Sequence, residues 1–142
     1  MKIKQSILKE LLQSIHDKGY ENGGILGGRN GVVTSFLQDE GMPSKYCCEY
    51  IPNVEILNQT IEEWSDSDIE FMGIYHTHYH DIKTLSKGDC EYITNIMDAM
   101  PDEISELYFP LVVLPLKEVV VYSAHKNDGS CHIALEQLSI VD

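Results

Sequence analysis

Two histidines, His76 and His78, lie where a predicted strand can present both of them to one metal ion. The preceding residues 71–75 are apolar with one glycine, a short run that is typical of a buried strand. Side chains on a strand alternate between its two faces, so the two imidazoles point the same way and Thr77 points the other way. Either histidine alone is more typical of a half-buried core residue, but the pair at this spacing favours metal binding.

A carboxylate follows where a third ligand is needed. Residues 90–100 carry apolar side chains at helical spacing, so Asp89 falls in the first turn of a predicted helix, beside the end of the histidine strand. Ser86 precedes Asp89 by three residues, and the pair is also typical of a capping box, a role that is compatible with metal binding. Two imidazoles and one carboxylate suit Zn2+ and leave the fourth tetrahedral position for water, as in catalytic sites.

A general base is available upstream at Glu21, which by itself would be an ordinary solvated loop carboxylate. In chain order, the pattern is Glu21, Gly23-Gly24, His76-x-His78, Ser86 and Asp89. It resembles the motif of the JAMM (MPN+) zinc metallopeptidases, in particular their small stand-alone prokaryotic JAB members, and the resemblance spans roughly residues 1–125. Relatives commonly have proline after the second histidine, where this chain has Tyr79.

The resemblance implies a fold, a metal and a mechanism. The expected fold is α/β: an MPN (JAB) domain, with a mixed β-sheet flanked by helices, similar to the cytidine deaminases. The deaminases' own His-x-Glu and Pro-Cys-x-x-Cys elements are absent from this sequence. The resemblance also implies one Zn2+ per chain, bound by His76, His78 and Asp89. Glu21 would act as general base, and Ser86 would donate a hydrogen bond to the developing oxyanion.

The substrate class is likewise implied by the resemblance. Catalytic JAMM proteins cleave isopeptide or peptide bonds after the C-terminal Gly-Gly tail of ubiquitin-like proteins. The segments that eukaryotic relatives enlarge to hold ubiquitin correspond to about residues 38–50 and 101–109 here, and both are short. The alternatives are a hydrolase that releases an amino acid or peptide from a sulfur-carrier protein and, from another class, a non-catalytic MPN scaffold that binds protein partners. Residues 79–85 are expected to hold the substrate tail. The candidate contacts are Tyr79, His80 and Leu85.

The rest of the chain predicts the elements that position this site. Asn30-Gly31 is a strong signal for a hairpin turn between strand-like runs at 23–28 and 32–37. Apolar spacing predicts an amphipathic helix over residues 1–18, and a second helix begins at Pro52, with Trp64 in the core. Further strands are predicted at 46–51, 111–114 (with Pro110 and Pro115 at its margins), 118–124 and 132–135.

Composition limits the class of protein. With 142 residues, of which 43% are hydrophobic, the chain can form one domain over residues 1–142 with its own core. A net charge of −13 argues against nucleic acid, which needs a basic surface, and suits a neutral or basic protein partner. Much of this charge falls on predicted helix ends and loops, where it is equally typical of a solvated surface. The four cysteines lack metal-site or disulfide spacing, and no segment resembles a signal peptide or a membrane span. We therefore expect reduced thiols, no membrane association and a cytoplasmic location; the sequence does not indicate an oligomeric state.

Overall fold

The computed structural model describes residues 1–43 and 50–142. In chain order its elements are β1 (Lys2–Lys4), α1 (Gln5–Ser14), β2 (Gly23–Arg29), β3 (Val32–Asp39), α2 (Val54–Asp66), β4 (Glu70–His78), α3 (Lys87–Ala99), β5 (Glu106–Val113), β6 (Glu118–Asn127), β7 (Ser130–Glu136) and β8 (Ser139–Val141). The described strands form one sheet in the order β7-β6-β5-β4-β2-β3-β1-β8. β4 is central: it pairs antiparallel with β2 and parallel with β5.

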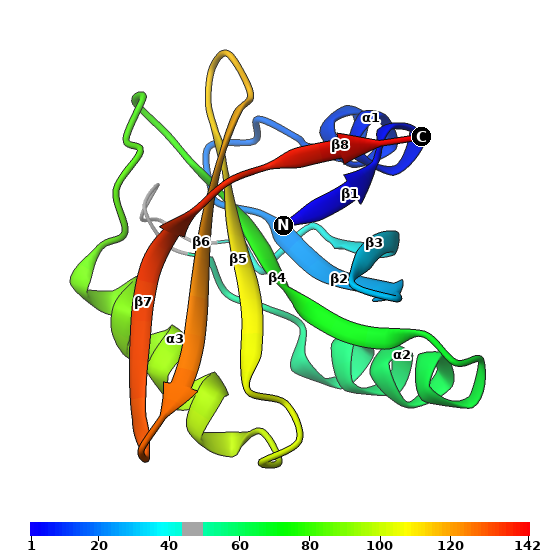
Figure 1. Cartoon of the computed structure of the whole chain (residues 1–142). Coiled ribbons are helices and arrows are strands. Elements are labelled where there is room, and N and C mark those ends of the chain that lie inside the picture. The colour runs from blue at the N-terminus through cyan, green and yellow to red at the C-terminus, as the bar shows by residue number, and fades with distance from the viewer. Residues whose placement is uncertain (44–49) are drawn as a thin grey trace.

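The sheet is curled. The two strands at its opposite edges, β7 and β8, are neighbours in the sequence, so the edges must lie close together. Only residues 137 and 138 separate β7 from β8, and the chain crosses from one edge to the other beside the N-terminus (Figure 1). The backbone N–H of Ser139 donates to the carbonyl of Met1 at 2.9 Å, which holds this crossing in place.

Helices cover both faces of the sheet. Leu26 and Tyr75 belong to the core cluster beneath α1, whereas Ile25 and Ile74 belong to the cluster beneath α2 and α3. The alternation between neighbouring residues is what a sheet buried on both faces requires. His76 continues the series of Ile74, so the histidines lie on the face that α2 and α3 cover. The mixed sheet with flanking helices confirms the predicted fold class.

Local signals predicted several elements well. The turn at Asn30 (φ 52°) and Gly31 (φ 73°) joins β2 and β3, as the hairpin signal indicates. Asn53 caps α2, its side chain accepting a hydrogen bond from the backbone N–H of Ile56. Trp64 is half-buried and packs against the cluster beneath α2 and α3.

The predicted helix over residues 1–18 is wrong at both ends. Ile3 lies in β1, where it pairs with Val33 of β3 and Ile140 of β8, and α1 ends at Ser14. A three-residue strand carries too short a pattern to be told from the first turn of a helix. At the other end, the Lys117 ammonium donates to the Leu12 carbonyl at 2.7 Å, satisfying one of the orphan acceptors of the last turn.

The later strands are longer than predicted, and Pro110 lies inside β5, not at its margin. The β4–β5 ladder is interrupted opposite Pro110, because it pairs Gly73 with Tyr108 and resumes only at His76 with Leu111. A proline without an N–H is tolerated where a ladder is broken. β8 was not predicted. Of the predicted strand at 46–51, residues 46–49 lie outside the described residues, and Tyr50 and Ile51 are not in a strand.

Among the helices described, none is both long and apolar enough to cross a bilayer. Cys90 and Cys131 are free thiols. The other two cysteines, Cys47 and Cys48, lie outside the described residues.

Candidate metal centre

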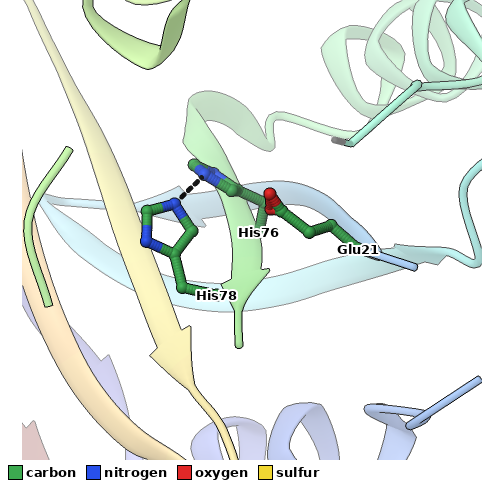
Figure 2. Close-up of side chains that lie close together, drawn as sticks. All are labelled: Glu21, His76 and His78. Atoms are coloured by element: carbon green, nitrogen blue, oxygen red, sulfur yellow. Dashed lines mark hydrogen bonds between the residues drawn. The ribbon is translucent and has the colours of Figure 1, made fainter. Parts of the chain in front are cut away.

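The carboxyl end of β4 holds His76 and His78 on the same face of the sheet, and both side chains are buried. Their Nε2 atoms lie 3.0 Å apart, so the two rings converge on one point (Figure 2). Thr77, between them, faces the other way: its Oγ1 accepts from the Asn22 backbone N–H at 3.0 Å, and its own N–H donates to the Asn22 carbonyl at 2.8 Å. This pair of bonds ties the segment before β2 to the histidine strand.

Asp89 reaches the same point from the first turn of α3. One carboxylate oxygen lies 3.3 Å from His76 Nε2 and the other lies 3.1 Å from His78 Nε2. The predicted capping box is present: Ser86 Oγ accepts from the Asp89 N–H at 3.0 Å, and the Ser86 N–H donates to Asp89 Oδ2 at 2.8 Å. The cap therefore fixes the carboxylate that faces the histidines.

Glu21, just before β2, approaches the same two histidines. Its side chain is 3% exposed, and its carboxylate lies with the two imidazoles in a group whose ligand atoms are all within 4.8 Å of one another (Figure 2). Gly23 makes this approach possible, because it pairs with His76 and a Cβ there would overlap the Tyr75 carbonyl. Glycine is therefore required at position 23 by the close approach of β2 to β4.

The electrostatics of the cluster are dominated by Asp89. Burial acts to raise the pKa of Asp89, but its hydrogen bonds to the two histidines and Ser86 outweigh burial and hold that pKa well below its usual value. Burial lowers the pKa of His76. Burial also acts to lower the pKa of His78, but the hydrogen bond to Asp89 and the charges of Asp89 and Glu21 raise it overall. Asp89 is therefore ionised, as a carboxylate metal ligand must be.

Two contacts orient the imidazoles, and sequence reasoning identified neither. The Nδ1–H of His78 donates to the carbonyl of Ile82 at 3.1 Å, which in the neutral ring leaves the lone pair on Nε2, toward the cluster. The ring of Tyr50 lies parallel to that of His76, with centroids 6.1 Å apart and an interplanar angle of 7°. The Tyr50 hydroxyl donates to Asp39 at 2.9 Å, so the end of β3 holds the ring beside His76.

A small cavity of about 120 Å³ opens beside the cluster, and most predicted site residues line it. Its lining residues are Glu21, His78, Tyr79, Ile82, Thr84, Leu85 and Ser86. Two of the predicted substrate contacts, Tyr79 and Leu85, are among them. His80 is not: it is exposed, with φ 58°, in the turn that follows β4.

The donor set fits zinc. Two imidazole Nε2 atoms and an ionised carboxylate face one point, and the tautomer of His78 is fixed by a backbone carbonyl, which is the arrangement that zinc ligands adopt. Glu21 is near enough to act either on the metal or on its water.

Solved structures match the fold of the chain, whereas no protein-family model and no curated protein matches its sequence. Protein DSY2949 from Desulfitobacterium hafniense superposes with a TM-score of 0.71 at 14% identity, covering 99% of this chain and 92% of that one. The JAB1/MPN domain protein AF2198 from Archaeoglobus fulgidus does so with a TM-score of 0.55 at 16% identity, covering 100% of both chains. The chain has an MPN/JAMM-type fold. A structure described as a JAMM metalloprotease-like zinc site in the proteasome and signalosome gives a TM-score of 0.54 at 19% identity, covering 100% of this chain and 98% of that chain.

Within this MPN fold, the strand with the two histidines, the segment with Glu21 and the start of α3 meet at one end of the sheet. This end of the sheet therefore holds a group of side chains, Glu21, His76 and His78, that can bind a metal ion. The predicted set of His76, His78, Asp89, Glu21 and Ser86 is brought together.

Proposed function

We propose that this chain is a zinc-dependent hydrolase that cleaves peptide or isopeptide bonds after the C-terminal Gly-Gly tail of a ubiquitin-like protein. One observation carries the proposal: Asp89 and the two histidines converge with separations of 3.0 to 3.3 Å, beside a cavity lined by Glu21 and Ser86. A scaffold that only bound partners would not need an ionised carboxylate fixed between two buried imidazoles.

Asp89 and Glu21 have different roles in this proposal. Asp89 is the ligand, because its oxygens are in contact distance of both Nε2 atoms and the Ser86 N–H fixes its orientation. A zinc ion held there would acidify a water molecule and polarise a carbonyl. Glu21 would act as the general base, taking a proton from the attacking water and passing it to the leaving amine. Ser86 Oγ accepts a hydrogen bond from the Asp89 N–H. The hydroxyl hydrogen of Ser86 can therefore donate to the developing oxyanion.

The size of the cavity supports a tail without side chains. At about 120 Å³, with Tyr79 and Leu85 among its walls, the cavity beside Ser86 has room for little more than backbone. A sulfur-carrier protein is the alternative source of such a tail. A cytoplasmic location and a neutral or basic partner complete the proposal, the latter because the chain carries a net charge of −13.

The test is turnover of a ubiquitin-like fusion with a cleavable Gly-Gly junction by wild type and by Glu21→Gln. We expect the variant to lose at least ~100-fold in kcat while its zinc content stays at one ion per chain. Glu91→Gln, an exposed glutamate on α3, is the matched control and should behave as wild type. Wild-type turnover by Glu21→Gln would refute the general base, whereas loss of zinc would make Glu21 a ligand.

A second experiment addresses the tail. Replacing Gly-Gly in the substrate by Val-Val should lower kcat/KM by at least ~100-fold, or about 2.7 kcal/mol of transition-state binding. Equal cleavage of both tails would favour a less selective peptidase. Zinc-loaded wild type that cleaves neither substrate would favour the scaffold.

A further inference from the structure

A large hollow lies away from the metal centre, where β4 and β5 separate. A groove of about 710 Å³ opens between the amino ends of these strands, and it is walled by the end of α2 and by residues 103–105. Figure 1 shows β4 running away from β5 toward α2 at this end. From Glu70, in the groove, to His78, at the metal centre, β4 spans about 26 Å at the rise of an extended strand.

The groove exists because the pairing of β4 with β5 does not extend to the amino ends of the two strands. This pairing starts only at Gly73 and Tyr108, where a Cβ on Gly73 would overlap the Tyr108 backbone, so the strands touch there. Before that point, among the described strands, Glu70 and Phe71 pair with β2 alone, Met72 lies at a bulge in that pairing, and residues 106–107 pair with β6 alone. Each strand therefore presents an unpaired backbone edge to the groove, and such an edge can receive an extended peptide.

The lining of the groove selects for side chains of two kinds. Its apolar members are half-buried or buried, and all but Ile69 belong to one of the two core clusters: Ile61, Ile69, Phe71, Met72, Ile104 and Tyr108. Its charged members are all acidic, and no described lining residue is Lys, Arg or His. Glu106 pairs with His125 at 3.0 Å, whereas the exposed side chains of Asp68, Glu70 and Glu103 form no ion pair with any described residue.

The nearby cations do not neutralise these carboxylates. Arg29 donates to the backbone carbonyls of Ser67 and Asp68, and the Lys126 ammonium donates to the carbonyl of Met100. The rim of the groove therefore keeps its negative charge, while its floor is apolar.

We propose that this groove binds an extended, lysine- or arginine-bearing segment of a partner protein. The partner backbone lies along the free edge of β4 or β5. Because side chains alternate along an extended peptide, one set contacts the apolar floor and the other meets the acidic rim. The groove is independent of the proposed hydrolysis, since none of its lining residues belongs to the metal centre.

The test uses fluorescence anisotropy with the full chain and a short labelled peptide that alternates lysine with valine. We expect saturable binding, weakened roughly 10-fold by the double variant Glu70→Lys, Glu103→Lys. Glu10→Lys, a charge reversal on the exposed face of α1, is the matched control and should bind as wild type. Thermal melting of each variant checks that the fold is retained.

A second peptide separates strand pairing from charge attraction. The same sequence with N-methyl groups on alternate amides keeps every charge but cannot pair with a strand edge, so we expect it to bind at least ~10-fold more weakly. Equal binding of the two peptides, or equal weakening by Glu10→Lys and by the double variant, would overturn the proposal. Binding of a glutamate–valine peptide as tight as that of the lysine–valine peptide would overturn it as well.

Discussion

The two ends of β4 differ in how their backbone edges are used. At the carboxyl end, His76, Thr77 and His78 pair with Leu111, Val112 and Val113 of β5, and all three side chains are buried. At the amino end, Glu70 and Phe71 pair with β2 alone among the described strands, and Glu70 is exposed beside the groove. β4 is thus paired with β5 at its carboxyl end, called here the closed end, and unpaired on that side at its amino end, the open end.

Each construction suits a different task. A metal centre needs its donor atoms fixed relative to one another, and pairing on both edges, burial and the Asn22–Thr77 bonds provide this. Recognition of an extended peptide needs free N–H and C=O groups, which only an unpaired edge supplies. The shared strand can serve both because the ladder with β5 begins at Gly73, between the two ends.

The largest effect is expected at the closed end. His76→Ala should weaken zinc binding by more than ~100-fold, because loss of an outer contact alone already costs 10- to 100-fold. His80→Ala, which changes an exposed histidine four residues away, should leave affinity unchanged. Competition with a chromophoric chelator measures both variants. Wild-type affinity in His76→Ala would contradict the site, and a similar loss in both variants would show that the effect is not local.

Next in size is the effect of packing around the closed end. Gly23→Ala should lower the free energy of unfolding by about 2 kcal/mol, or roughly 4–8 °C in Tm, because the added Cβ meets backbone atoms of Tyr75 and His76. Gly88→Ala, where the nearest atom is 3.7 Å away, is the matched control and should not destabilise. Equal melting temperatures for the two variants would mean that the β2–β4 approach tolerates a methyl group.

A smaller effect is expected from the contact that orients His76. Tyr50→Leu removes the ring beside His76 and should weaken zinc binding about 10-fold, the lower end of the range for outer contacts. Tyr50→Phe keeps the ring and removes only the hydrogen bond to Asp39, so it should lose less. If Tyr50→Leu binds zinc like wild type in the same chelator assay, the ring does not position His76.

The smallest effect tests whether the two ends are independent. Saturating the groove with the lysine–valine peptide should change zinc affinity by less than ~2-fold, because the groove and the cavity beside the metal centre share no lining residue. High salt should weaken binding of the peptide to the groove and leave zinc binding nearly unchanged, because exposed charges are screened and buried contacts are not. Competition titrations with and without peptide measure the coupling. A change in zinc affinity of more than ~5-fold would show that the two sites are energetically coupled.

Local sequence rules determined the parts of the metal centre. The period of two predicted that His76 and His78 share a face, and the spacing of Ser86 and Asp89 predicted the cap that holds the carboxylate. The Asn30-Gly31 turn predicted the hairpin that follows Glu21. Each of these signals lies within a few residues of the structure that it specifies. The MPN/JAMM-type fold was also predicted, through the order in which those residues follow one another.

Only the tertiary structure decided how distant segments meet. Tyr50 lies beside His76 because its ring packs against Gly23 and its hydroxyl bonds to Asp39, and no local pattern connects these residues. The strand at Ile3 forms because β3 and β8 flank it, so its own three residues could not indicate it. The groove arises from a ladder that starts at Gly73 with Tyr108 and no earlier. Pairings between segments far apart in the sequence depend on how the whole sheet curls, and a periodic pattern within one segment carries no information about that curl.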